Sequence, residues 1–368
     1  MAGIYVHIPF CSSFCLYCDF YSIVSKSDKV EVFKEGLLNE IYSRQDFFKK
    51  RGVLPETLYF GGGTPSLLFI SDLEEITEAI KKVFGVNEFR EFTIEVNPDD
   101  VSVEKLECFR RIGVNRISMG VQSFCDNHLL WMRRRHSATQ AKEAFRLMRE
   151  HGFDNISIDL IFGFSGLSRG EWEYNISQAL VLAPEHISCY QMSVEPGSNL
   201  ASLLKSGEYV EPLEEESAWQ YEFLQRRLLE NGYIQYEISN YSLPGFKSIH
   251  NSNYWERSPY LGLGPSAHSF DGNRIRRWNS SNIIKNNEFS EEILSDIDIF
   301  NEQIMLGLRK TSGFSLESLS SSLLARVQPL LKKLVANGDL ILNGDNLFIP
   351  SSKLFISDGI MANLFITD

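Results

Sequence analysis

The first two-thirds of the chain alternates short apolar stretches with longer helical patterns, and no other feature constrains its fold as strongly. The short stretches are apolar on both faces, which is typical of parallel strands covered by helices. Six strands are expected, at 3–9, 57–63, 91–98, 115–122, 155–163 and 186–192. Helices are expected between them, at about 30–50, 71–84, 102–112 and 137–151, and again before the sixth strand. Six strand–helix repeats predict a doubly wound sheet or a barrel, and periodicity alone does not choose between the two.

The pattern changes after about residue 193. Proline and glycine residues predict a loop over 193–212, and a helix is expected at about 213–231. A strand near 234–241 follows, and then an irregular stretch rich in aromatic residues, 242–282.

A separate small unit is expected from about residue 297. Helices are predicted near 297–308 and 322–337, and Pro329 interrupts the second one. The stretch 339–350 predicts a hairpin that turns at Asn343 and Gly344. Helix, helix and hairpin is the order of a winged helix. The expected division is therefore an α/β unit, a connecting region and a winged-helix-like domain, at 1–240, 241–296 and 297–368.

Composition and charge exclude several classes of protein. The formal net charge is −12, and the second helix of the C-terminal unit carries only Arg326, Lys332 and Lys333. Both observations argue against a nucleic-acid-binding protein, so we interpret that unit as a cap or a partner surface. No run of about 18 uncharged apolar residues predicts a transmembrane helix, and the N-terminus lacks a signal-peptide pattern. We expect a cytoplasmic protein with reduced thiols.

Three of the six cysteines, Cys11, Cys15 and Cys18, lie within eight residues of one another. Three thiolates can hold three corners of a [4Fe–4S] cluster and leave one iron free for a substrate or cofactor. The alternative is a zinc site with His7 as a fourth ligand, but no second cysteine pair supports it. The remaining cysteines are expected to be bystanders, namely Cys108, Cys125 and Cys189.

The C-x₃-C-x₂-C spacing resembles that of the radical S-adenosylmethionine (SAM) superfamily. The wider run IYVHIPFCSSFCLYCDF is similar to the oxygen-independent coproporphyrinogen III oxidases and to their relatives, the HemW heme chaperones. Further matching segments follow in the same order along the chain, among them FGGGTPSLL, EVNP, GVNRISMGVQSF, NISIDLIFG, HNSNYW and YLGLGPSAHS. The resemblance implies an α/β fold, a partial (β/α)₆ TIM-type barrel, with a [4Fe–4S] cluster whose free iron is chelated by SAM.

The same resemblance implies where SAM would be bound. Glycines after the second strand let the backbone approach a ligand closely, and polar residues at the ends of later strands lie where barrel sites form. The implied SAM-binding residues are Tyr5, Tyr17, Gly62, Gly63, Thr64, Glu95, Gln122, Arg134 and Asp159. Ser165 stands where the family usually has a proline, which makes the second SAM site less certain.

Two features favour the chaperone branch over the oxidase branch. Phe20 occupies the place of a further oxidase cysteine, and Cys11 lies too near the start for the oxidase's N-terminal extension. The expected function is heme binding and delivery to a heme-requiring acceptor, without coproporphyrinogen III oxidase activity. The alternative is that oxidase activity, a radical decarboxylation of propionate side chains.

The segment HNSNYW supplies the expected heme site. The resemblance associates it with heme binding, and a histidine beside two aromatic rings suits axial ligation and stacking on a porphyrin. The expected heme residues are His250, Tyr254 and Trp255, and His268 is a second candidate ligand. The implied partners are heme, a heme donor and heme-requiring acceptor proteins, membrane-bound ones included.

Overall fold

The computed structural model of the chain describes residues 1–24, 27–282 and 288–367. Within these residues, twelve strands form one sheet in the order β14-β13-β12-β11-β1-β4-β5-β6-β7-β8-β10-β9. Two smaller sheets complete the fold, one beside the start of the barrel and one in the C-terminal unit.

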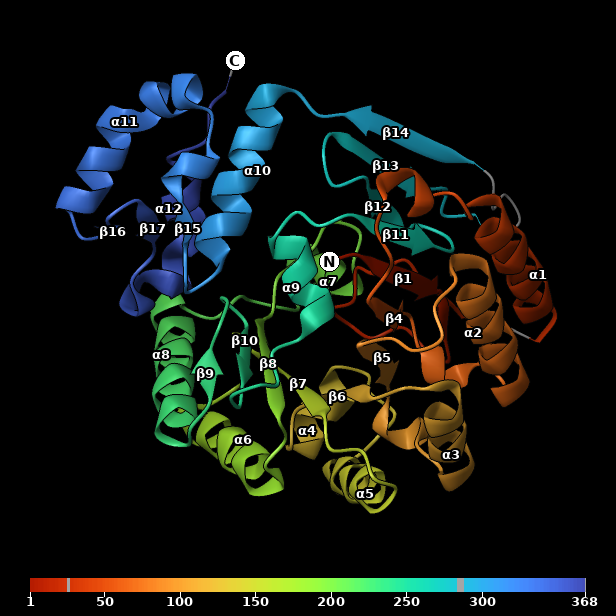
Figure 1. The fold of residues 1–368 in the computed structure, drawn as a ribbon. Coiled ribbons are helices and arrows are strands. Elements are labelled where there is room, and N and C mark those ends of the chain that lie inside the picture. The colour runs from red at the N-terminus through yellow and green to blue at the C-terminus, as the bar shows by residue number, and fades with distance from the viewer. Residues whose placement is uncertain (25–26, 283–287, 368) are drawn as a thin grey trace.

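Six consecutive strands of the large sheet are parallel and follow the order of the sequence, which is the order of a barrel. They are β1 (Gly3–Ile8), β4 (Thr57–Gly62), β5 (Glu91–Val96), β6 (Arg116–Gln122), β7 (Ile156–Phe162) and β8 (His186–Gln191). The connecting helices lie outside the curved sheet in Figure 1. They are α1 (Ser27–Ser43), α2 (Ile70–Phe84), α3 (Val103–Ile112), α4 (Asp126–Trp131), α5 (Ala138–Glu150) and α6 (Arg169–Leu182). The structure thus confirms the expected partial barrel.

Alternation along β1 shows how the barrel divides its side chains. Ile4, Val6 and Ile8 are fully buried in the apolar core, whereas Tyr5 and His7 alternate with them and face the opposite side of the sheet. The interior of the barrel is consequently polar, and its apolar core lies between the strands and the outer helices.

Both edges of the barrel are extended. β8 pairs with antiparallel β10 (Asn240–Ser242), which pairs with β9 (Ile234–Gln235), and β1 pairs in parallel with β11 (Tyr260–Leu263). Three antiparallel strands continue from β11, namely β12 (His268–Phe270), β13 (Ile275–Asn279) and β14 (Phe289–Ile293). Much of the stretch expected to be irregular therefore belongs to the main sheet. Its strands are too short for a periodic pattern to reveal them.

Two further helices follow β8: α7 (Asn199–Ser206) and α8 (Glu214–Glu230). The expectation of a loop over 193–212 was wrong where α7 forms. Ser198 caps this helix, since its side chain accepts a hydrogen bond from the Ala201 amide at 3.0 Å. The helix also matters for the cysteines, because the Leu200 amide donates to the Leu16 carbonyl at 2.9 Å.

The C-terminal unit has the element order of a winged helix. It contains α10 (Asp296–Arg309), β15 (Phe314–Ser315), α11 (Ser321–Ala336), β16 (Ile341–Asn343), β17 (Asn346–Phe348) and α12 (Ser357–Ala362). The expectation that Pro329 interrupts the second helix was wrong, because α11 runs through it. Val327 and Leu331 are buried on either side of the proline, and their packing compensates for one missing backbone hydrogen bond. Short 3₁₀ helices complete the chain at Lys49–Arg51, Pro65–Leu67, Pro98–Asp100, Leu316–Ser318 and Ser351–Ile356.

No helix within the described residues is long and apolar enough to span a membrane.

Candidate functional site

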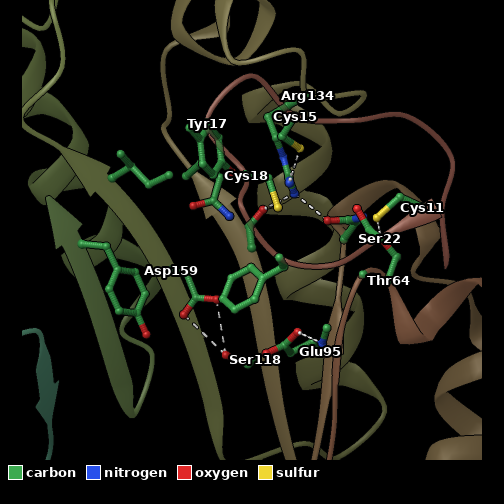
Figure 2. A pocket seen from close by; sticks show the side chains of 18 of the residues that line it. Cys11, Cys15, Tyr17, Cys18, Ser22, Thr64, Glu95, Ser118, Arg134 and Asp159 are labelled. Carbon is green, nitrogen blue, oxygen red and sulfur yellow. Dashed lines mark hydrogen bonds between the residues drawn. The ribbon is translucent and has the colours of Figure 1, made fainter. Parts of the chain in front are cut away.

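A cavity of about 370 Å³ lies at the carboxyl ends of the parallel strands and reaches into the barrel. The cysteine triplet and most of the expected SAM-binding residues line it together, namely Cys11, Cys15, Tyr17, Cys18, Gly62, Gly63, Thr64, Glu95, Gln122, Arg134 and Asp159. Figure 2 shows many of these side chains converging on one space from different strands. Tyr5, His250, Tyr254 and Trp255 do not line the cavity, although Asn251 of the HNSNYW segment does.

The cysteine loop is held at several points. It lies between β2 (Phe10–Cys11) and β3 (Ile23–Val24), which pair with each other. Leu16 anchors its middle, because its carbonyl accepts from Leu200 and its amide donates to the Met132 carbonyl. These contacts place the three thiols at the mouth of the cavity.

The thiols have polar neighbours suited to a charged cluster. The Arg134 guanidinium lies 3.3 Å from the Cys15 sulfur, and the Thr64 hydroxyl donates to the Cys11 sulfur at 3.8 Å. Burial raises the pKa of Cys11 and raises the pKa of Cys18 to about 11. Among the described residues, no three His, Cys, Asp or Glu side chains are already gathered at ligating distances. The soft sulfur donors and the adjacent cation nevertheless fit a [4Fe–4S] cluster.

The glycine run is required by a close approach of two chain segments. A Cβ atom on Gly63 would lie 2.6 Å from the Phe10 carbonyl oxygen and 2.9 Å from the Pro9 carbonyl carbon. Gly62 has φ +109° and packs against the His7 ring, so a side chain there is excluded for two reasons. The end of β4 therefore supports the start of the cysteine loop directly.

Glu95 lies on β5 and faces the cavity. Its carboxylate accepts hydrogen bonds from the Tyr59 hydroxyl at 2.7 Å and from the Gly62 amide at 3.2 Å. Burial is the largest influence and raises the pKa of Glu95 to about 7. A carboxyl group in this position can accept hydrogen bonds from the amino group of a bound ligand.

Arg134 and Asp159 also line the cavity. Besides Cys15, the Arg134 guanidinium contacts the Asn97 side chain and donates to the Gly120 carbonyl at 2.9 Å. The Ser118 hydroxyl donates to Asp159, and burial raises the pKa of Asp159 to about 6. Gln122 ends β6 with φ +66°, where the pairing with β7 is irregular.

The HNSNYW segment forms a short helix, α9 (Ile249–Trp255), and not the irregular structure that was expected over 242–282. Ser248 caps it, and the buried Glu91 carboxylate accepts from the amides of Ile249 and His250 at 2.8 Å each. These two caps explain why a helix forms there. It packs against β4 and α10, and Figure 1 shows it between the barrel and the C-terminal unit.

His250 is buried, with 2% of its surface exposed. Its Nδ1 lies 2.8 Å from the Thr57 hydroxyl and its Nε2 lies 2.9 Å from the Tyr254 hydroxyl. Burial lowers the pKa of His250 to about 3, so the imidazole is neutral. Both nitrogens are engaged in this conformation, and an iron ion could reach neither. Trp255 lies under the Arg309 guanidinium of α10, at 4.6 Å from the ring centre.

His268 lies in a second, separate hollow of about 440 Å³. Its ring stacks on Trp278 at 6.1 Å between centres, and its side chain is exposed. In contrast to His250, it faces a space that a ligand can enter.

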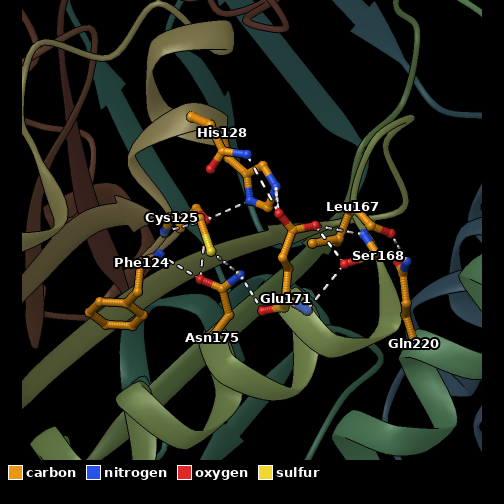
Figure 3. A network of polar contacts seen from close by, with 10 residues as sticks. Phe124, Cys125, His128, Leu167, Ser168, Glu171, Asn175 and Gln220 are labelled. Atoms are coloured by element: carbon orange, nitrogen blue, oxygen red, sulfur yellow. Dashed lines mark hydrogen bonds and ion pairs between the residues drawn. The ribbon is translucent and has the colours of Figure 1, made fainter.

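A polar network on the outside of the barrel joins α4 to α6 (Figure 3). The His128 ring lies between the Ser123 hydroxyl, at 3.1 Å, and Glu171, at 3.5 Å. Asn175 donates to the Cys125 sulfur at 3.9 Å. Cys125 therefore has a local structural partner and lies apart from the cysteine triplet.

Sequence reasoning missed several residues that line the cavity, among them Asn97, Arg116, Ser118, Ser188 and Asn251. Arg116 and Ser118 precede Gly120 and Gln122 on β6 at intervals of two, so they face the same side of the sheet. This period of two was the signal that could have found them.

Comparisons with known proteins agree with this architecture. The model of the radical SAM superfamily matches residues 5–178, and that of the HemN C-terminal domain matches residues 294–352. The heme chaperone HemW of Bacillus subtilis is 35% identical over 94% of both chains. The heme chaperone HemW of Escherichia coli is also 35% identical, over 75% of this chain and 72% of the relative.

Among solved structures, coproporphyrinogen III oxidase (HemN) from Escherichia coli shares the fold, with a TM-score of 0.84. The alignment covers 99% of this chain and 90% of the oxidase, at 21% identity. Identity at this level establishes the fold and not the activity. Taken with the relatives above, these matches show that the chain belongs to the HemW family of the radical SAM superfamily.

Proposed function

We propose that the protein is a heme chaperone that binds heme and delivers it to a heme-requiring acceptor protein. The observation that carries this proposal is the similarity to HemW chaperones from end to end, at 35% identity over 94% of both chains for the Bacillus subtilis relative. In this proposal the cavity would hold the cofactors, and the HNSNYW helix would hold the cargo.

Cys11, Cys15 and Cys18 would hold a [4Fe–4S] cluster at the mouth of the cavity. When bound, the cluster and SAM would supply one-electron chemistry. The protein's own residues would position the cluster. Arg134 places a positive charge beside the Cys15 sulfur, and the fit of Gly63 against the Phe10 carbonyl sets where the loop begins.

The residues around SAM would divide into two groups. Glu95 and the Gly62–Thr64 backbone would meet the polar end of the cluster-bound molecule, because they lie beside the cysteine loop. Gln122, Asp159 and Tyr17 also line the cavity and would contact the rest of the ligand or a second one.

His250, Tyr254 and Trp255 are proposed to bind heme after α9 has moved. A neutral imidazole is a good axial ligand, and Tyr254 already lies edge-on to it at 5.1 Å between ring centres. Release of the imidazole requires that its contacts with Thr57 and Tyr254 break. His268, which is exposed beside Trp278, is the next candidate ligand.

The test combines two measurements on cluster-loaded protein under anaerobic conditions. A heme titration should give a saturable Soret shift at about one heme per chain. Incubation with SAM, a reductant and coproporphyrinogen III should give no protoporphyrinogen IX. Absence of a Soret shift would contradict the chaperone proposal, and multiple turnovers in the second assay would establish the oxidase activity instead.

A further inference from the structure

The inner wall of the barrel contains one arginine that sequence analysis did not single out. Arg116 is the first residue of β6, it lines the cavity, and 2% of its surface is exposed. It is the largest buried cation of the described residues, and only Trp172 precedes it among the largest fully buried side chains. A buried guanidinium normally has acceptors for its five N–H groups.

Arg116 has no such acceptor within the part of the chain that the structure describes. Its Nε is buried without a hydrogen-bond partner, and no hydrogen bond or close ion pair joins its guanidinium to another residue of 1–24, 27–282 or 288–367. On the neighbouring strand, Thr93 lies opposite Arg116 in the register, and its buried hydroxyl is also without a partner. Two adjacent buried donors thus lack an acceptor at the same depth of the barrel.

The two carboxylates whose pKa the charge of Arg116 lowers do not fill this role. Glu95 is bonded to the Tyr59 hydroxyl and the Gly62 amide, and Asp159 accepts from Ser118. The positive charge of Arg116 influences both, because it lowers the pKa of each carboxyl against the stronger effect of burial. It therefore contributes to the field in the cavity without being neutralised by either group at close range.

Arg116 lies deeper in the barrel than the cysteine loop. Arg116 precedes Gln122 by six residues on one strand, which corresponds to about 20 Å at the rise of a β-strand. The cysteines and Gln122 lie toward the mouth, at the carboxyl end of the strands. A carboxylate bound to Arg116 would therefore differ from the one that chelates an iron at the cysteine loop.

We propose that Arg116 is a binding residue for a ligand carboxylate at the deep end of the cavity. The planar guanidinium presents two parallel N–H groups, which match the two oxygens of a carboxylate. The Thr93 hydroxyl adds a donor beside it. This inference deepens the proposed function, because both of its ligands carry such a group: the amino-acid part of a SAM-type molecule and the propionates of heme.

The experiment measures binding by calorimetry and Soret absorbance on cluster-loaded protein, without an activity assay. Each ligand is paired with an analogue that lacks the carboxylate: SAM with decarboxylated SAM, and heme with heme dimethyl ester. Wild-type protein is compared with Arg116→Gln. Arg135→Gln is the control, because Arg135 also lines the cavity but is paired with Asp99 and Asp100.

Arg116→Gln should weaken binding of one carboxylate-bearing ligand by about 10- to 100-fold, as expected for hydrogen bonds between charged groups. It should leave the matching analogue within about twofold of wild type. Selective loss for SAM identifies the amino-acid carboxylate, and selective loss for heme identifies a propionate. Arg135→Gln should not discriminate within either pair.

Equal effects on both members of each pair, or no effect on either, would overturn the proposal and make Arg116 a structural counter-charge. If Arg116→Gln does not fold, Arg116→Lys is used instead, because lysine keeps the positive charge but lacks the two parallel N–H groups. It should still weaken one carboxylate-bearing ligand more than the analogue of that ligand without the carboxylate. Wild-type protein without a Soret shift would contradict the chaperone function alone, because the SAM pair still tests Arg116.

Discussion

Glu91 holds the start of α9 in place. Its replacement should lower the stability of the protein and at the same time strengthen heme binding. Its carboxylate is 3% exposed and accepts the amides of Ile249 and His250 at 2.8 Å and the Ser248 hydroxyl at 3.3 Å. In Glu91→Gln, one oxygen remains an acceptor and the new NH₂ group faces a backbone N–H. We expect the folded protein to lose about 2–3 kcal/mol, since hydrogen bonds to a charged group contribute about 1.5–3 kcal/mol each.

The same change should strengthen heme binding. If His250 binds heme only when α9 has left its place, the apparent Kd equals the intrinsic Kd divided by the fraction of open molecules. If the mutation destabilises only the closed state, by 2–3 kcal/mol, the fraction of open molecules rises by about 30- to 150-fold. Urea unfolding measures the first effect and a Soret titration measures the second.

Glu185→Gln is the matched control. Glu185 also accepts a backbone amide, that of Ile156 at 2.9 Å, and its carboxylate pairs with Arg149 of α5. It should lower stability without changing heme affinity. If Glu91→Gln is destabilised as expected but its heme affinity is unchanged or weaker, then closure of α9 does not restrict heme binding and His250 is not the ligand.

Three further predictions concern the cavity. Changing any of Cys11, Cys15 or Cys18 to Ala should abolish anaerobic reconstitution of the cluster, measured as iron content and absorbance near 400 nm, whereas Cys108→Ala should not. Addition of SAM should alter the EPR spectrum of the reduced cluster, and Glu95→Ala should weaken that change; an unaltered wild-type spectrum at saturating SAM would contradict the SAM site. Glu95→Gln should gain stability relative to wild type, by about 1–3 kcal/mol from about pH 5 to about pH 8, in urea unfolding of cluster-free protein. The sign follows because burial raises the folded pKa of Glu95 to about 7, so wild type loses stability as this carboxyl ionises; a constant difference between the two pH values would refute the argument.

The six barrel strands could be predicted because apolar residues fill the positions of each strand that face the outer helices, such as Ile4, Val6 and Ile8 in β1. The expectation that these strands are apolar on both faces was wrong, because polar residues such as His7, Glu95 and Arg116 face the barrel interior. The sequence alone did not distinguish a barrel from a doubly wound sheet, since that choice depends on which side each helix covers. The cysteine triplet could be predicted as a group because its spacing is local. Glu95 followed from its place near the end of β5, together with the resemblance to a known family. Asp159 followed from the resemblance alone, because the expectation that it ends a strand was wrong: it lies in the middle of β7.

The burial of His250 could not be predicted in the same way. Its burial results from Glu91, which lies far away in the sequence and caps the helix from the floor of the barrel. The isolated segment, with two asparagines and two aromatic residues, has little helical preference of its own. The inward orientation of Arg116 could not be predicted for a related reason. A charged residue at the start of a strand usually faces solvent, and only the closed curvature of the sheet turns it inward.

The pairing of β1 with β11 has a consequence for how the molecule is made. Gly3 lies opposite Tyr260 and Val6 opposite Leu263, so the strand that leads into the cysteine loop gains its second neighbour only when most of the chain has left the ribosome. Contacts so distant in sequence form late and slowly. A nascent chain that ends before residue 260 has its three thiols but an unsupported strand beneath them. Loading of the cluster should therefore follow synthesis, and fragments truncated before β11 should retain iron poorly.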